Sequence, residues 1–341
     1  MATIKDIARE LGLSAATVSR ALAGNTRIPE ATRDRVQALA QEMGYAPNRA
    51  AQNLVGGRSS GFAGLVLTDP GYGREDSYLG EYISGLGFGL AETGIDLFLA
   101  AIPAGQSELS VIRNIVTTRR ADGLILGRTS EVDPRVDYLI AAGFPFVTHG
   151  RVLSDALPYS WVDTDGTAAF GEAFDLLYAL GHRRFALLTI EEQMTFRHHR
   201  TEGVLQAMER RGDPEVSLTI ATTSRYDRAQ RQEVVQRLLT SDPRPTAILT
   251  LFDSLALNVL QVAESLSLSV PGDLSVIGYD NITSAALARP GLTTFDSDTF
   301  SSARETGRML VERMKTPDAA QHSLLIRPKL VLRASHGPAP G

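Results

Sequence analysis

Short apolar stretches alternate with helical stretches from Phe62 onward, and this alternation constrains the fold more than any other feature. Strands that alternate with helices are joined by crossover connections, so they form parallel sheets. The sequence therefore predicts an α/β body. The candidate strands are 62–67, 97–100, 123–126, 146–148, 160–162, 184–190, 246–250 and 274–278, with helices such as 78–92 and 167–180 between them.

The length of the chain calls for more than one module. A single core stops growing near about 250–300 residues, and the chain has 341. The region after Phe62 is long enough for two α/β lobes. Ligands in such folds bind at the carboxyl ends of the strands, so we expect a site where two lobes face each other.

The segment before Tyr45 shows apolar residues at helical spacing instead of strands. Thr3 and Ser14 stand where helix N-caps are needed, and Gly12 can end the first helix. Two short helices joined by a turn with glycine form a helix-turn-helix. A generic helical bundle would show the same spacing. The three apolar stripes are Ile4/Ile7/Ala8/Leu11, Val18/Ala21/Leu22 and Val36/Leu39/Ala40/Met43.

Several segments resemble the lac repressor (LacI/GalR) family of bacterial transcription regulators over essentially the full length. In the head they are TIKDIA from Thr3, LSAATVSRAL from Leu13 and GYAPNRAA from Gly44. In the body they are LGHRR from Leu180, VPGDLSVIGYDN from Val270, PGLTT from Pro290 and LVLRAS from Leu330. The resemblance implies a recognition helix in the DNA major groove, a homodimer on a near-palindromic operator, and a sugar-sensing, periplasmic-binding-protein-like (type I) body.

The resemblance also implies domain boundaries. The expected DNA-binding domain is 1–46, followed by a hinge helix and linker at 47–61 and an effector-binding domain at 62–341. Within that domain we expect an N-lobe of 62–161 and 293–322, and a C-lobe of 162–292 and 323–341.

The predicted DNA contacts begin on the second helix. Ala15 and Ala16 match the positions that vary with operator in the family, and their methyl groups can touch a thymine methyl but cannot hydrogen-bond. Arg20 is the candidate for bidentate reading of a guanine. The proline Pro29, where the family often has serine, suits a first helical turn. The other predicted contacts in the head, at the helix start or on phosphates, are Thr3, Ser14, Thr17, Ser19 and Asn25.

The run 48–55 is too short for a stable isolated helix, so it can fold on DNA. In the family this segment forms a helix in the minor groove. Leu54 matches the leucine that wedges open the central base step, and Ala51 allows close helix approach. Asn48 and Gln52 match backbone or groove contacts. A plain linker with a chance leucine is the alternative.

The predicted effector contacts come from the resemblance and from strand ends. Asp280 matches a carboxylate that accepts hydrogen bonds from sugar hydroxyls, and Arg200 matches a ligand-binding arginine; an internal salt bridge is the alternative. Phe252 stands where many members have asparagine, so it can stack a sugar ring. The segment 146–151 is similar to members associated with α-glucosides and related oligosaccharides. Further candidates are Asp69, Tyr78, Thr148, His149, Arg151, Trp161 and Asp163.

Composition fits a DNA-binding head on an acidic body. The net charge is −5, but residues 1–58 carry eight basic and five acidic side chains, so the head is basic and the rest carries the excess of acid. There is no cysteine, which excludes disulfides and thiolate metal sites. The absence of a leader or membrane span predicts a cytoplasmic protein. We expect no cofactor and no metal, and we interpret His182, His198 and His199 as structural or exposed.

Two rival classes remain to be weighed. An enzyme would need a catalytic motif, and no nucleophile elbow, P-loop or dinucleotide fingerprint is present; Gly85–Gly89 is spaced wrongly and falls within a helix pattern. A periplasmic receptor would lack the head. The function that the resemblance implies is a repressor of carbohydrate uptake or catabolism that a sugar releases from DNA. A corepressor-dependent regulator that senses a non-sugar metabolite is the alternative. The end of the chain lacks leucine heptads, which predicts no tetramer.

Overall fold

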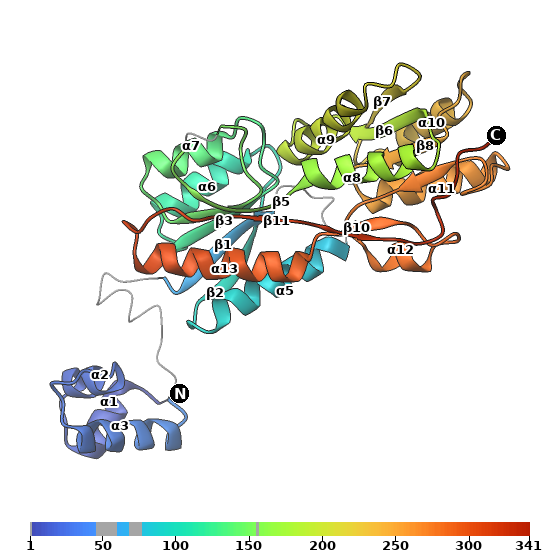
Figure 1. Cartoon of the computed structure of the whole chain (residues 1–341). Helices are drawn as coiled ribbons and strands as arrows, with labels where there is room; N and C mark the ends of the chain where they lie inside the picture. Colours follow the sequence, from blue (N-terminus) through green and yellow to red (C-terminus); the bar gives the residue numbers. More distant parts are fainter. Residues whose placement is uncertain (1, 46–59, 68–76, 155–156) are drawn as a thin grey trace. The chain divides into compact units, whose positions relative to one another are not determined.

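The structure, a computed structural model, describes residues 2–45, 60–67, 77–154 and 157–341. The chain separates into two compact units, residues 1–60 and 61–341. We describe the first as the head and the second as the body (Figure 1).

The head is a three-helix unit. Thr3 forms a capping box with Asp6 at the start of the first helix, and Gly12 ends that helix in the left-handed conformation, with φ of 65°. The apolar stripes meet in one core of Ile7, Ala8, Val18, Ala21, Val36 and Ala40. The helices are α1 (Ile4–Leu11), α2 (Ala15–Leu22) and α3 (Glu30–Glu42).

The N-lobe of the body is built on a parallel six-stranded sheet of order β11-β5-β4-β3-β1-β2. Alternation along β3 sends Leu124 and Leu126 to one face and Ile125 to the other. Helices α6 and α7 pack on the first face, and α5 and α13 on the second. The strands are β1 (Phe62–Leu67), β2 (Asp96–Ala101), β3 (Gly123–Gly127), β4 (Phe146–His149), β5 (Ser160–Thr164) and β11 (Ser323–Ile326), and the helices are α5 (Ser77–Ala91), α6 (Glu108–Thr117), α7 (Pro134–Ala141) and α13 (Thr299–Lys315).

The C-lobe is built on a parallel four-stranded sheet of order β7-β6-β8-β9. Its core draws on the sheet and on helices α8 to α12. Strand β7 lies at the edge, and its many exposed side chains explain why no apolar stretch predicted it. The strands are β6 (Arg184–Ile190), β7 (Ser217–Thr223), β8 (Ala247–Thr250) and β9 (Ser275–Ile277), and the helices are α8 (Gly166–Ala179), α9 (Thr195–Arg211), α10 (Arg228–Leu239), α11 (Asp253–Ser265) and α12 (Thr283–Leu287).

Glycines allow helices α5 and α13 to lie side by side (Figure 1). A Cβ added at Gly85 or Gly89 would clash with the backbone carbonyl oxygens of Phe300 and Arg304. These glycines lie inside α5, as the sequence indicated, and they serve helix packing.

The predicted lobe boundaries are wrong at three places. Residues 162–164 were assigned to the C-lobe, but they form the end of β5 in the N-lobe sheet. The resemblance assigns residues 323–326 to the C-lobe, but β11 pairs with β5 in the N-lobe sheet. The leucines of β11 are exposed, so the sequence shows no buried-strand pattern for this edge strand. Residues 293–296 were assigned to the N-lobe, but Phe295 is buried in the C-lobe core. The short strand β10 (Thr294–Asp296) instead pairs with β12 (Lys329–Val331) in an antiparallel ribbon.

Candidate functional site

A cavity of about 540 Å³ lies between the two lobes of the body. Its walls follow the carboxyl ends of the parallel strands, where α/β folds bind ligands. The N-lobe contributes the ends of β3, β4 and β5, and the C-lobe contributes the ends of β7, β8 and β9 and the start of α9. The lining residues are Tyr78, Arg128, Thr129, His149, Gly150, Asp163, Thr164, Thr195, Phe196, Arg200, Arg225, Tyr226, Arg231, Phe252, Ser254, Tyr279, Asp280, Ile282 and Ser297.

With Arg231, which is 6% exposed, Arg200 is one of two buried arginines among the described residues that line this cavity. It projects from α9 and is 7% exposed. Its guanidinium carbon lies 3.7 Å from the centre of the Tyr279 ring, and its Nη1 donates to the carbonyl of Leu251. Its buried Nε has no hydrogen-bond partner among the described residues. Because Arg200 lines the cavity, its guanidinium can donate to a ligand acceptor there.

Asp163 supplies a carboxylate at the end of β5. Its Oδ1 accepts a hydrogen bond from the Thr164 amide at 2.8 Å, and its Oδ2 lies 3.6 Å from Nε of Arg151. Burial outweighs these contacts and raises the pKa of Asp163 to about 6. The group is therefore ionised near neutral pH and titrates just below it.

His149 is neutral in the same wall. Its Nδ1 lies 3.1 Å from the Tyr78 hydroxyl and its Nε2 lies 3.1 Å from Oγ of Ser302. Burial lowers the pKa of His149 to about 4. The ring therefore offers one donor and one acceptor, without charge, near pH 7.

Phe252 lines the cavity as an apolar face. The guanidinium carbon of Arg225 lies 5.0 Å from the centre of its ring. The next residue, Asp253, is fully buried; Thr294 Oγ1 donates to its Oδ1 at 2.6 Å and the Ile282 amide to its Oδ2 at 3.0 Å. Burial raises the pKa of Asp253 to about 7. Asp253 therefore fixes the loop that carries Asp280.

The structure brings together six of the predicted effector residues, namely Tyr78, His149, Asp163, Arg200, Phe252 and Asp280. Asp69 lies outside the described residues. The cavity also takes in residues that the sequence reasoning missed. Arg128 and Thr129 follow a predicted strand, so the strand-end rule could have found them. Arg225 and Tyr226 follow β7, which no apolar signal predicted.

Three predicted residues do not line the cavity. Thr148 points to the opposite side of β4 from His149, because successive strand residues alternate, and its hydroxyl donates to Gly150. Trp161 lies two residues before Asp163, about 7 Å back along the strand. Arg151 lies over the Trp161 ring, 5.2 Å from its centre, and donates to His199.

The predicted contacts of the head gather around α2. Ala15, Ala16, Ser19 and Arg20 are exposed. Ser14 caps the helix, because its Oγ accepts the Thr17 amide at 3.1 Å.

Further predicted contacts also have local roles. Thr3 caps α1, and Asn25 accepts the Arg27 amide at 2.9 Å. Hydrogen bonds from Thr3 and the charge of Arg9 lower the pKa of Asp6. Pro29 is the N-cap of α3 and not a residue of its first turn. The hinge residues Asn48, Ala51, Gln52 and Leu54 lie outside the described residues.

No group of three or more metal-ligating side chains occurs in the described part of the chain. His182 has a structural environment, since its ring nitrogens contact hydroxyls of Thr246 and Ser275 at 2.9 and 3.1 Å. Within the same ranges, no helix is long and apolar enough to cross a membrane.

The two modules define a class of protein, a small helical DNA-binding head joined to a two-lobed ligand-binding body. Residues 3–48 match the model of bacterial regulatory proteins of the lacI family, and residues 174–336 match a periplasmic binding protein-like domain. The HTH-type transcriptional regulator AglR of Rhizobium meliloti is 32% identical over 99% of this chain and 95% of its own length. The chain belongs to the lacI family, and it is a DNA-binding transcriptional regulator rather than an enzyme.

Solved structures agree with this assignment. The regulator CelR in complex with cellobiose matches 98% of this chain and 100% of its own, with a TM-score of 0.74 and 26% identity. The lac repressor dimer bound to operator and the anti-inducer ONPF matches 98% of each chain, with a TM-score of 0.83 and 22% identity, which establishes the shared fold.

Proposed function

We propose that this regulator is a repressor that binds a near-palindromic operator as a homodimer and leaves it when a carbohydrate enters the cavity. The observation that carries the effector assignment is Arg200, a buried guanidinium that lines the cavity and is held against Tyr279. A polyhydroxylated ligand offers acceptors for such a group and hydroxyl donors for Asp163 and Asp280.

The ring of Phe252 further supports a carbohydrate. Sugar rings have apolar faces, and an aromatic side chain in the wall gives such a face a flat partner. The complex of CelR with cellobiose makes a disaccharide a reasonable first ligand to test. Glucosides and related oligosaccharides remain the predicted class.

For the head, we propose that α2 enters the major groove, with Ala15, Ala16 and Arg20 at base edges and Thr3, Thr17, Ser19 and Asn25 on phosphates. Leu54, with Asn48, Ala51 and Gln52, remains the predicted minor-groove element. Effector binding and operator binding then oppose each other, and each must weaken the other by the same factor.

The test is a gel-shift titration of the full chain on the DNA upstream of its own gene, with cellobiose and a panel of other mono- and disaccharides. Release of the shifted complex by a sugar is the expected result. Tightening by a ligand would identify a corepressor and reverse the sign, and a shift that no sugar alters would contradict the carbohydrate assignment. Light scattering should give a dimer, and a stable tetramer would contradict the predicted assembly.

A further inference from the structure

One segment of the N-lobe reaches across to the C-lobe beside the cavity. It runs between β3 and α7 and contains Thr129. The carbonyl of Thr129 accepts hydrogen bonds from the amide and the hydroxyl of Thr195, at 3.0 and 2.9 Å. The two hydroxyl oxygens lie 2.6 Å apart, and both residues are 2% exposed. The contact is therefore fully desolvated, which strengthens it.

A short backbone pairing extends this contact. Ser130 and Met194 form an antiparallel bridge, and the Glu131 amide donates to the Gln193 carbonyl at 3.3 Å. Because the hydrogen bonds flank the pair rather than join it, Ser130 and Met194 are a non-hydrogen-bonded pair, whose Cα atoms lie about 4.5 Å apart.

The contact also completes helix α9. The N-cap residue of α9, Met194, makes no side-chain capping hydrogen bond. The Thr195 amide, one of the first orphan donors of the helix, finds its acceptor in Thr129 of the other lobe. The same helix carries Arg200 into the cavity. Separation of the lobes would therefore remove a partner from the helix that presents this arginine.

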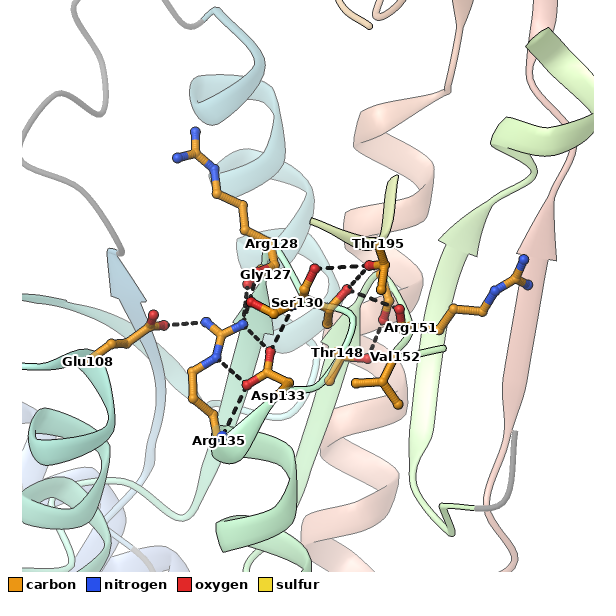
Figure 2. A network of polar contacts seen from close by, with 12 residues as sticks. Glu108, Gly127, Arg128, Ser130, Asp133, Arg135, Thr148, Arg151, Val152 and Thr195 are labelled. Atoms are coloured by element: carbon orange, nitrogen blue, oxygen red, sulfur yellow. Dashed lines mark hydrogen bonds and ion pairs between the residues drawn. The ribbon is translucent and has the colours of Figure 1, made fainter. Parts of the chain in front are cut away.

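The N-lobe side of the contact is held firmly in place. Figure 2 shows Arg135 between Glu108 and Asp133, with bonds to the Gly127 and Arg128 carbonyls. Arg128 has φ of 50°, a conformation that non-glycine residues seldom adopt. Hydrogen bonding to Arg135 lowers the pKa of Asp133. Arg135 thus anchors the backbone immediately before Thr129.

We propose that the contact between Thr129 and Thr195 stabilises the closed arrangement of the two lobes over the cavity. The contact thereby sets the fraction of protein molecules that are closed and able to bind effector. The effector part rests on the proposed function. If the closed state binds effector better, any contact that exists only in that state raises apparent affinity in proportion to the closed fraction. Thr129 and Thr195 are then positioning residues for binding.

Other contacts between the lobes are weaker candidates. Arg128 donates to the Tyr226 hydroxyl at 3.1 Å, but Tyr226 is 52% exposed. Arg151 donates to His199 at 3.3 Å, and the pKa of His199 is lowered to about 4 by burial, so that ring is neutral near pH 7. The Tyr279 hydroxyl also donates to Oγ1 of Thr164 at 2.9 Å, but Thr164 is only half-buried. Among the described residues, the contact of Thr129 with Thr195 is the one that combines two buried hydroxyls, a helix-capping bond and a backbone bridge.

An engineered disulfide reporter tests directly whether the contact of Thr129 with Thr195 stabilises the closed lobes. The chain has no cysteine, so Ser130→Cys with Met194→Cys introduces a single possible pair across the bridge. A Cα separation near 4.5 Å suits a disulfide. The effective concentration of the two thiols, measured in a glutathione redox buffer with neither DNA nor sugar present, reports how often the lobes are closed.

The decisive variant adds Thr129→Val and Thr195→Val to the reporter. Valine keeps the shape and removes both hydroxyls, so we expect the effective concentration to fall at least fivefold. Thr189→Val is the matched control, because the Thr189 hydroxyl is buried without a partner among the described residues. When serine replaces valine at position 195, one hydroxyl returns, and most of the lost effective concentration of the two thiols should be recovered.

An unchanged effective concentration in the double valine variant would overturn the proposal, as would a reporter pair that does not crosslink in the parent chain. Circular dichroism melts check folding. If the double variant does not fold, Thr195→Val alone is compared with Thr195→Ser in the same way. Because no effector is used, a failure of the carbohydrate assignment in the gel shift would leave this result standing.

Discussion

The head and the body place their predicted contacts in opposite ways. In the head, Ser14 to Arg20 form one continuous run at the start and along the exposed side of α2. In the body, the cavity draws side chains from strand ends and helix starts between Tyr78 and Ser297. Contacts on the exposed side of one helix can be substituted one at a time without moving the others. The geometry of a cavity between two lobes instead depends on every contact that positions the lobes.

The comparison predicts that an ion pair in the body contributes far more to the free energy of unfolding than an ion pair in the head. Arg135→Met leaves the buried carboxylate of Asp133 and the half-buried carboxylate of Glu108 without their cation. Loss of one member of a buried ion pair costs about 3–5 kcal/mol. Urea unfolding of the body should show a loss of this size.

The control lies in the head. Arg9 pairs with Asp6 at 2.8 Å, but Arg9 is an exposed side chain. Arg9→Ala should leave the unfolding curve unchanged, because exposed pairs contribute little. Equal losses of unfolding free energy for Arg135→Met and Arg9→Ala would contradict the predicted difference between body and head.

A second prediction separates effector binding from DNA binding. Arg200→Met removes the cavity guanidinium and keeps much of its apolar contact with Tyr279. Hydrogen bonds to charged groups contribute about 1.5–3 kcal/mol, so effector affinity should fall about 10- to 150-fold. Gel shifts without sugar should be unaltered, since Arg200 belongs to the body. Calorimetry with the releasing sugar measures the loss, and equal affinity in both proteins would remove Arg200 from the site.

The same contrast explains what the sequence could predict. Helix stripes and caps are local, so Thr3, Ser14 and Gly12 identified the helices of the head. Apolar strands identified both sheets, but β7 and β11 escaped because edge strands expose their side chains. The cavity residues that were predicted came from strand ends, as for His149, or from the family resemblance, as for Arg200. The contact of Thr129 with Thr195 joins residues 66 positions apart, and no local pattern encodes it.

A third prediction concerns the readout of DNA. Arg20→Ala should abolish operator preference, with a loss of about 1–3 kcal/mol in discrimination at one base pair. Changing Ala16 should retarget the site instead, because a longer side chain can reach a different base edge. Both residues are exposed, so unfolding should be unaffected. Binding-site selection is the measurement, and an unchanged consensus for both variants would contradict the assignment of α2.

The smallest predicted effect is a pH dependence of effector binding. The pKa of Asp163 is raised to about 6 by burial, so the carboxylate is protonated progressively below that pH. A protonated carboxyl offers a sugar hydroxyl a weaker acceptor, so affinity should fall up to about tenfold between pH 7 and pH 5.

His149 and His199 do not account for this change, because burial lowers the pKa of each to about 4 and both rings stay neutral across the window. Asp163→Asn should therefore flatten the profile measured by calorimetry, while Asp165→Asn, two residues further along at the cap of α8, should preserve it. A profile that survives Asp163→Asn would place the titrating group elsewhere.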